Sequence, residues 1–321
     1  MATSLRHFIE NRPDATFQPE KGRYHLYVSL ACPFACRVLA AINVKGLQEY
    51  VDVTVVFPVF QRTRPNDPAD THTGWAFVDP VTTPFLAGPS GVGQFSSKGS
   101  SVDPIHGAQF VRDLYERVTK EPVRYSVPLL WDKKLDTIVS TESADMVRMF
   151  NTAFESLKPS NIDLYPVELR AQIDEVNSWV CDKINNGVYK VGFAQKQEAY
   201  DQALTELFQA LDRIEEMLSQ HRFLIGNTFT EADIRLFVTL IRFDEVYALQ
   251  YKCNVKLLRE YHNIFNYLKD VYQLPGIAET VDFDHIKLSY FGSQANLNPF
   301  GIIPRGPGVD YAAPHDRHRF M

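Results

Sequence analysis

The residue of this sequence best suited to chemistry is Cys32, in the segment SLACPFACRV. The alternating, aromatic-rich segment RYHLYVSL comes just before Cys32 and predicts a strand. Apolar residues at helical spacing follow Cys32. Pro33 comes directly after Cys32, and proline is favoured in the first helical turn because its missing N–H has no intrahelical partner to lose there. We therefore expect Cys32 to be the cap or the first residue of a helix.

A cysteine at the start of a helix faces unpaired backbone N–H groups and the positive end of the helix dipole, which favour its thiolate. The pKa of a free cysteine is ~8.5 and falls to roughly 3.5–7.5 in such positions. Because the thiolate is the nucleophilic form, Cys32 is the candidate reactive group. The alternative is a buried, inert cysteine that only fills space, a common role of this residue type.

The other cysteines, Cys36, Cys181 and Cys253, carry weaker signals. Cys36 follows Cys32 by one helical turn on the same face and could serve as a resolving thiol. The geometry for an unstrained disulfide is not assured at this spacing, and we favour a buried packing role. We interpret Cys181 and Cys253 as structural. The positions match no zinc spacing, so we expect no metal site.

A second pair of segments points to a peptide ligand. Ser126 and Val127 precede Pro128 at the start of a buried-looking strand, where a proline is often cis and leaves the preceding backbone open to pair with an extended peptide. Glu142 and Ser143 open the next helix, where backbone donors and a carboxylate could hold an amino-acid zwitterion. The alternative for each segment is ordinary turn and capping chemistry.

The elements that must position these residues follow from periodicity. The first half reads as strand, helix, strand (51–57), a long loop or insertion over 58–104, a helix from about His106, two strands (VPLLWD and TIVS) and a helix (TESADMVRMFN). The first two strands are expected to be parallel, with a right-handed crossover. This order predicts an α/β thioredoxin-like domain over 1–154, with an N-terminal extension.

The second half, 155–321, is predicted to be all-α with a C-terminal extension. Helical spacing of apolar residues covers 166–186, 197–219, 231–249 and 262–272. Thr230 and Asp233 have the spacing of a capping box ahead of a strongly apolar helix, which we place centrally in the helical core.

Composition limits the classes of function. The chain has 321 residues, 45% hydrophobic and 22% charged, with a formal net charge of -6. That charge argues against a nucleic-acid partner held through phosphates. No apolar run reaches the length of a membrane span or a signal peptide, and four cysteines are too few for a disulfide scaffold. We expect a cytoplasmic protein with no membrane partner.

The sequence as a whole resembles the glutathionyl-hydroquinone reductases, also called Xi-class glutathione transferases. The similar stretches include GRYHLYVSLACPFACRVLAAINVKGL, GWAF at 74–77, VPLLWDKKLDTIVSTESADMVRMFN, INNGVYKVGFAQ at 184–195, FLIGNTFTEADIRLF and FDHIKLSYFGSQANLNPFGIIPRGP. They span nearly the whole chain. The resemblance implies the glutathione-transferase fold, a thioredoxin-like domain followed by an all-α domain, and a homodimer.

The resemblance also implies the reaction and its residues. Glutathione would be the co-substrate, and Cys32 would attack the sulfur of a glutathionyl-hydroquinone to form a mixed disulfide that a second glutathione resolves. The family's glutathione site corresponds to Trp75, Val127, Glu142 and Ser143, with Pro128 as a cis proline. Its quinol site corresponds to Tyr189 and Tyr290, and one hydroxyl would protonate the departing ring carbon. Without the resemblance, both tyrosines would be interpreted as packing residues.

The sequence departs from the family in two places. The usual Cys-Pro-Trp-Ala-His-Arg motif is here Cys32-Pro33-Phe34-Ala35-Cys36-Arg37, which keeps apolar bulk at Phe34 but lacks an indole N–H and an imidazole. The segment between Pro58 and Gly74 is longer than expected for the family, and the stretch 82–104 looks inserted. The longer segment and the inserted stretch affect the expected mouth of the site and its substrate range, whereas packing at Phe34 should be preserved.

Two other functions remain open. An omega-like thiol transferase, or dehydroascorbate reductase, would use Cys32, Val127 and Glu142 but would not need the tyrosines. A transferase-fold interaction module without catalysis would need no cysteine at a helix start, which disfavours it.

Overall fold

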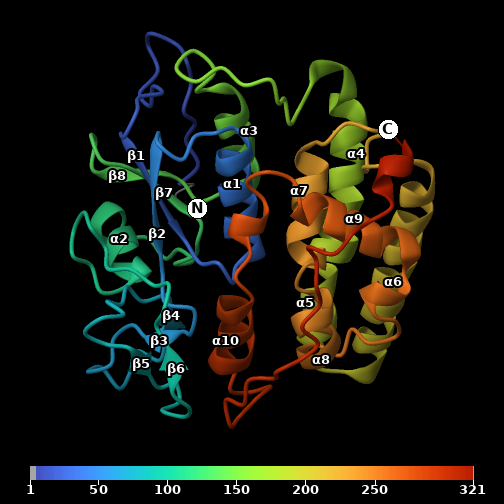
Figure 1. Cartoon of the computed structure of the whole chain (residues 1–321). Helices are drawn as coiled ribbons and strands as arrows, with labels where there is room; N and C mark the ends of the chain where they lie inside the picture. Colours follow the sequence, from blue (N-terminus) through green and yellow to red (C-terminus); the bar gives the residue numbers. More distant parts are fainter. Residues whose placement is uncertain (1–4, 321) are drawn as a thin grey trace. The chain divides into compact units, whose positions relative to one another are not determined.

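The computed structural model describes residues 5–320, which divide into two compact units. The first unit extends to Ser160 and also includes Val281–Pro304. The second comprises Asn161–Thr280 and the segment that begins at Arg305. The first contains the sheet and the second is helical, as the sequence predicts (Figure 1).

The first unit is built around a mixed sheet with strand order β2-β1-β7-β8. Its strands are β1 (Tyr24–Val28), β2 (Val51–Val55), β7 (Leu129–Asp132) and β8 (Thr137–Ser140). Strand β1 is parallel to β2, with Tyr24 opposite Val51, and antiparallel to β7, with Tyr24 opposite Asp132. The predicted parallel strand pair is confirmed, and β1, in the middle of the sheet, is buried along its whole length.

Helices cover both faces of this sheet (Figure 1). Helix α1 (Pro33–Val44) connects the parallel strands and packs against α3 (Ser143–Thr152), and α2 (Val111–Val118) lies on the opposite face. Helix α1 ends where Gly46 adopts φ 68°, a left-handed conformation that glycine reaches without a Cβ clash. The start of α1 is therefore set by the end of β1, and the end by a glycine.

The segment before β1 is attached to the free edge of the sheet. His7 N–H donates to the Val139 carbonyl (2.8 Å), Thr141 N–H donates to Leu5 (3.1 Å), and Arg6 pairs with Ser140 as an isolated bridge. The predicted N-terminal extension therefore lengthens the edge strand β8.

The insertion over 58–104 contains short strands that its composition did not predict. Strands β3 (Gln61–Arg62) and β4 (Thr73–Gly74) form one hairpin, and β5 (Phe85–Leu86) and β6 (Phe95–Ser96) form another. Helix α2 begins at Val111, later than the predicted start near His106. The reason is Asp103, whose carboxylate accepts backbone N–H groups of Ile105, His106 and Ala108 (3.1 Å each) and so holds that stretch in a turn.

Helix α10 (Phe283–Ser293) belongs to the first unit, whereas the sequence predicts that all residues after 154 lie in the helical half. The Ser293 hydroxyl accepts the Phe60 N–H (2.9 Å), and a ring nitrogen of His285 lies 2.7 Å from the Lys98 carbonyl oxygen. The chain thus returns to the insertion from more than 180 residues away, a contact between segments that local periodicity cannot reveal.

The second unit consists of helices joined by short turns. They are α4 (Arg170–Val180), α5 (Gly187–Gly192), α6 (Gln197–Gln220), α7 (Glu231–Leu240), α8 (Ala248–Gln250) and α9 (His262–Tyr272), with π-helical segments at Cys181–Asn185 and Phe243–Tyr247. The continuous helix predicted over 231–249 is interrupted. Tyr247 N–H reaches back five residues to the Arg242 carbonyl (3.4 Å), which widens the turn between α7 and α8.

The predicted capping box at the start of α7 is confirmed. The Asp233 carboxylate accepts the Thr230 N–H (2.9 Å), and the Thr230 hydroxyl accepts the Ala232 N–H (3.3 Å). All of α7 except Arg235 is buried, which places this helix in the middle of the second unit's core.

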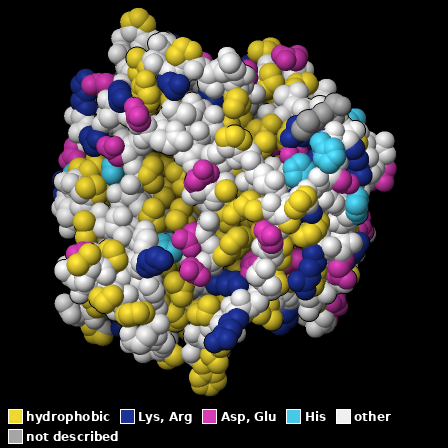
Figure 2. Space-filling view, in the orientation of Figure 1, with side chains coloured by type: hydrophobic (Ala, Val, Ile, Leu, Met, Phe, Trp, Pro, Cys, Tyr) yellow, Lys and Arg dark blue, Asp and Glu magenta, His cyan; other side chains and the backbone are white. Residues whose placement is uncertain are grey.

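The C-terminal extension packs along the second unit. The buried Arg317 donates to the carbonyls of Leu218 (2.8 Å) and Arg222 (2.9 Å) and so satisfies acceptors at the end of α6. Within residues 5–320, the helices are too short or too polar to span a membrane. On the face drawn in Figure 2, basic and acidic side chains are interspersed.

Candidate active site

Cys32 is the N-cap residue of α1, as the sequence predicts. Its backbone is extended (φ -79°, ψ 116°), Pro33 is the first helical residue, and the Cys32 carbonyl accepts the Cys36 N–H (3.0 Å). The residue is only partly buried. The sulfur therefore stands at the positive end of the helix dipole, where a thiolate is favoured and reagents in solution can reach it.

The Cys32 thiol lies against the segment that leads into β7. Its Sγ is 3.5 Å from the Val127 carbonyl oxygen, although the two residues are 95 positions apart. The Val127–Pro128 peptide bond is cis, as predicted. Val127 lies beyond the ladder that β7 forms with β1, which ends at Leu129. The structure thus brings together the predicted thiol and the predicted peptide-binding edge.

Cys36 has the surroundings of a packing residue. It is 1% exposed, and its thiol lies 3.2 Å from the Leu30 carbonyl oxygen and 3.9 Å from that of Ser29. Cys253, in the second unit, is buried as well, and burial raises the pKa of its thiol well above the ordinary value. Among residues 5–320 the four cysteines, Cys32, Cys36, Cys181 and Cys253, are not joined in disulfides.

Glu142 and Ser143 stand at the start of α3. Glu142 is the N-cap, and its Oε1 accepts the Ala144 N–H (3.0 Å), while Ser143 is the first helical residue and is buried. Asp145, in the first turn of the helix, forms an ion pair with Arg6 of the N-terminal extension. The start of α3 therefore combines the backbone N–H groups of its first turn with the Glu142 carboxylate. The negative charge of Asp145 in that turn is balanced by Arg6.

Trp75 follows the β3–β4 hairpin directly. Its carbonyl accepts the Val111 N–H at the start of α2 (3.0 Å), and Phe77 N–H donates to the Gln109 carbonyl (2.9 Å). The indole packs edge-on against Phe60, with ring centroids 4.5 Å apart. Trp75 is thus a partly exposed ring on a backbone that α2 anchors.

The two predicted substrate tyrosines lie in different units. Tyr290 belongs to α10 of the first unit and is 6% exposed. Tyr189 belongs to α5 of the second unit and is partly exposed, in an aromatic cluster with Phe193, Tyr247 and Tyr251 at centroid distances of 5.7–6.2 Å. The sequence did not predict this cluster, because its members come from different helices.

The departure from the family motif at Phe34 has a local counterpart. The Arg37 guanidinium lies over the Phe34 ring, 4.7 Å from its centroid, and Arg37 is 3% exposed. An apolar ring at position 34 therefore still covers a buried cation one turn further along α1.

A cavity of about 630 Å³ in the first unit was not predicted. Its lining comes from the insertion and the start of α2, and includes Gln61, Arg62, Phe77, Leu86 and Phe110. Within the described residues, His, Cys, Asp and Glu side chains form no cluster of three or more that could hold a metal ion.

The chain is similar to known proteins over most of its length. The family described as "Glutathione S-transferase, C-terminal domain" matches residues 197–270. The glutathionyl-hydroquinone reductase YqjG of Escherichia coli is 46% identical over 94% of this chain and 84% of its own length. Its glutathione-bound structure superposes with a TM-score of 0.87 at 44% identity, covering 98% of this chain and 96% of that one.

Two further relatives extend the comparison. The Xi glutathione transferase of Phanerochaete chrysosporium is 45% identical with a TM-score of 0.85, covering 98% of this chain and 99% of its own. A protein of Schizosaccharomyces pombe named glutathione S-transferase omega-like 2 is 42% identical over 92% of this chain and 89% of its own length.

This chain belongs to the glutathionyl-hydroquinone reductases, the Xi class of glutathione transferases. The similarity to members of this family extends over nearly the whole chain.

Proposed function

We propose that this chain reduces glutathionyl-hydroquinones to hydroquinones with glutathione as co-substrate, and that Cys32 is its nucleophile. The observation that carries the proposal is a thiol at the start of α1 whose sulfur lies 3.5 Å from the Val127 carbonyl. A thiolate is stabilised at this position, and a peptide paired with Val127 would bring its own sulfur beside Cys32.

The proposed reaction uses two thiols in turn, that of Cys32 and that of a second glutathione. The Cys32 thiolate attacks the glutathionyl sulfur of the substrate, the bond between that sulfur and the ring carbon breaks, and the carbon takes a proton. This step releases the hydroquinone and leaves glutathione joined to Cys32 by a disulfide. A second glutathione thiolate attacks the glutathione sulfur of that disulfide, which releases oxidised glutathione and restores the Cys32 thiolate.

The glutathione site is proposed from residues of the first unit. Val127 would pair with the cysteinyl backbone, with cis Pro128 shaping the turn, and Trp75 would pack over the peptide. Glu142 and Ser143 would hold the γ-glutamyl end at the start of α3, where backbone donors favour its carboxylate. The glutathione-bound relative supports glutathione as the ligand.

The quinol ring is proposed to contact Tyr189 and Tyr290. A phenol hydroxyl can both bind a quinol oxygen and donate the proton that the departing ring carbon requires. The aromatic cluster around Tyr189 supports a ring-binding surface on the second unit.

The deciding experiment incubates the purified protein with glutathione and a glutathionyl-hydroquinone and follows free hydroquinone and oxidised glutathione by chromatography. The proposal predicts that the two products appear in equal amounts. Absence of hydroquinone release would overturn it.

An omega-like thiol transferase is the second candidate. The name of the Schizosaccharomyces pombe relative favours it, and Cys32, Val127 and Glu142 would be sufficient for it. Such an enzyme would reduce a mixed disulfide of glutathione with hydroxyethanethiol, or dehydroascorbate, without releasing hydroquinone from the aromatic thioether. Assays of these substrates on the same preparation separate the two functions.

We also propose that the protein is a cytoplasmic homodimer. A reducing compartment supplies glutathione and keeps Cys32 as a thiol, and the homodimer follows from the family resemblance. Light scattering of the purified chain tests the dimer, and cell fractionation tests the compartment.

A further inference from the structure

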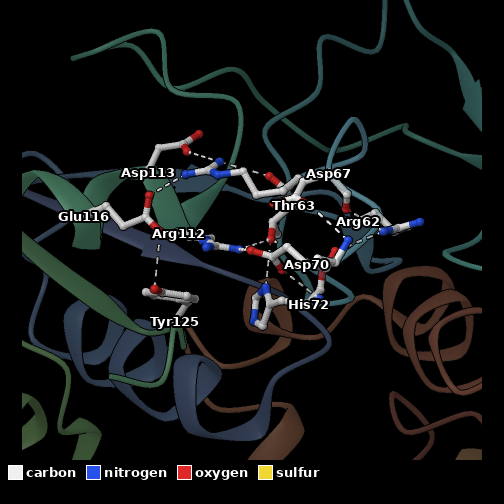
Figure 3. Close-up of polar contacts among 11 residues, drawn as sticks. Arg62, Thr63, Asp67, Asp70, His72, Arg112, Asp113, Glu116 and Tyr125 are labelled. Atoms are coloured by element: carbon white, nitrogen blue, oxygen red, sulfur yellow. Dashed lines mark hydrogen bonds and ion pairs between the residues drawn. The ribbon is translucent and has the colours of Figure 1, made fainter. Parts of the chain in front are cut away.

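A network of ion pairs connects α2 to the loop inside the β3–β4 hairpin (Figure 3). Arg112 donates from Nη1 to Asp70 Oδ2 (2.5 Å) and to Thr63 Oγ1 (3.1 Å), and its Nε donates to Glu116 Oε1 (2.6 Å). Arg64, from the same loop, pairs with Glu116 and with Asp113. The loop is therefore attached to α2 by two arginines. Arg112 extends from α2 to the loop, and Arg64 extends from the loop to α2.

The loop is also organised internally. The Arg62 guanidinium donates to the carbonyls of Asp67 (3.1 Å) and Asp70 (3.0 Å), and Thr63 Oγ1 lies 2.8 Å from His72 Nδ1. Asp70 further accepts the His72 N–H (3.0 Å). Asp70 therefore connects the internal hydrogen bonds of the loop to Arg112, which together with Arg64 attaches the loop to α2.

The same helix holds the segment that leads to Val127. The Arg112 guanidinium lies over the Tyr125 ring, 5.3 Å from its centroid, and the Tyr125 hydroxyl donates to Glu116 Oε1 (3.3 Å). The Tyr115 hydroxyl donates to the Ser126 carbonyl (2.8 Å). In Figure 3, Arg112 lies between Tyr125 and Glu116 on one side and Asp70 and Thr63 on the other.

The two segments that meet at Arg112 end in two walls of the proposed glutathione site. The hairpin ends at Gly74, directly before Trp75, and Tyr125 stands two residues before Val127. The Trp75 backbone is itself bonded to the start of α2, through Val111. Arg112 is therefore a side chain shared by the two segments that lead to Trp75 and Val127, whereas Cys32 lies at the start of α1, outside this network.

We propose that Arg112 is a positioning residue that sets the spacing between Trp75 and Val127 for glutathione. This inference rests on the proposed glutathione site and adds a residue that touches neither ligand nor sulfur. The side chains of Arg112 and Asp70 are only 15% and 22% exposed, so their ion pair also contributes to the stability of the loop, and the test has to separate glutathione binding from folding.

The test measures glutathione binding by calorimetry in a Cys32→Ser background, which prevents the formation of a mixed disulfide. Arg112→Gln is expected to weaken binding roughly tenfold, because residues that act on a ligand site through a packed network change its affinity by about this order. Arg112→Lys should recover only part of the loss, because one ammonium cannot replace a guanidinium that contacts Asp70, Thr63 and Glu116 in fixed directions.

The matched control is Arg117→Gln, on the same helix. Arg117 is 48% exposed and pairs with Asp136, away from the hairpin loop, so binding should stay within about twofold of the parent. Asp70→Asn removes the same contact from the loop side and should weaken binding to a similar extent. The double variant with Arg112→Gln should be little worse than either single change, because the two residues act as one unit.

A second measurement separates positioning from a general loss of structure. With Cys32 present and glutathione absent, the rate of Cys32 alkylation by iodoacetamide should change much less in Arg112→Gln than the affinity for glutathione, because Cys32 lies at the start of α1 and meets the moved segment only at the Val127 carbonyl. Glutathione binding unchanged by both Arg112→Gln and Asp70→Asn would overturn the proposal, as would alkylation slowed as much as binding is weakened.

These results are independent of the quinol chemistry. A parent protein that binds glutathione but releases no hydroquinone would overturn the proposed function and leave the role of Arg112 measurable. A parent that binds no glutathione would overturn both proposals.

Discussion

Helices α1 and α7 both begin after an extended residue, but different side chains stand at the two starts. At α7, Thr230 and Asp233 form a buried capping box, and Asp233 also accepts the Leu224 N–H (2.9 Å). At α1, the cap residue is Cys32, its first-turn residues are apolar or thiol, and its sulfur approaches the Val127 carbonyl. The start of α7 is therefore closed by a hydrogen-bonded capping box, and the start of α1 carries a thiol.

This difference in side chains gives the two helix starts different roles, one in chemistry at α1 and one in stability at α7. A capping box stabilises a helix by accepting its orphan N–H groups, and substitution of such a cap costs about 0.5–2 kcal/mol. A cysteine is a weak hydrogen-bonding group, so α1 gives up this stabilisation and leaves its dipole to act on a thiolate. The comparison predicts that changes at α1 affect chemistry and that changes at α7 affect stability.

The largest effect is expected for Cys32→Ser. A serine hydroxyl cannot form the mixed disulfide, so hydroquinone release should fall below detection, while the melting temperature should stay within about 2 °C of the parent because the cap is partly exposed. Turnover by chromatography and circular-dichroism melting are the measurements, with Cys181→Ser as control. Near-normal turnover by Cys32→Ser would refute the mechanism.

The next effect concerns stability at α7. Asp233→Ala leaves buried donors, among them the N–H groups of Leu224 and Thr230, without their acceptor, and should lower the free energy of unfolding by about 2–4 kcal/mol. Urea unfolding measures it. Asp201→Ala, an exposed change on α6, should cost less than about 0.5 kcal/mol. Equal costs for the two variants would break the comparison between the helix starts.

The same carboxyl group makes stability depend on pH. Burial raises the pKa of Asp233 from 3.8 to about 6. The folded protein then binds a proton more readily than the unfolded chain, so this group's contribution is present below pH 4 and is lost as pH rises through 6. Asp233→Asn should therefore show a smaller loss of unfolding free energy between pH 4 and 6 than the parent. An identical pH dependence in both proteins would contradict the assignment.

A smaller effect is expected for Tyr189→Phe and Tyr290→Phe, and it is selective. A lost hydrogen bond to a developing charge is worth roughly 1.5–3 kcal/mol, so turnover of a glutathionyl-hydroquinone should fall about ten- to a hundredfold. Turnover of the glutathione–hydroxyethanethiol disulfide should be spared, because that substrate has no ring. Tyr200→Phe is the control, and equal losses on both substrates would remove the quinol pocket from the proposal.

The smallest effect is expected for Cys36→Ala. Its buried thiol donates to the Leu30 carbonyl, and a second glutathione can resolve the mixed disulfide, so activity should stay within about threefold of the parent. Mass spectrometry during turnover provides the check. Accumulation of a disulfide between Cys32 and Cys36 would show that the two helix positions react together.

Local sequence determined the chemistry at the start of α1 and the stability at the start of α7. Pro33 and the alternating strand before it specify where α1 begins, and the Thr230–Asp233 spacing specifies where α7 begins, because helix termini are decided by residues within one turn. The strands β1, β2, β7 and β8 and the helices α6 and α9 were predicted for the same reason, since their periodicity is contained in the segment itself.

Only the tertiary structure decided which distant segments surround these helix starts. The approach of Cys32 to Val127 spans 95 residues, the Arg112–Asp70 ion pair spans 42, and the Lys98–His285 contact that attaches α10 spans 187. None of these separations leaves a periodic signal in the sequence. Contacts of this kind depend on how the sheet, its insertion and the returning helix pack together, and packing is a property of the folded chain rather than of any one segment.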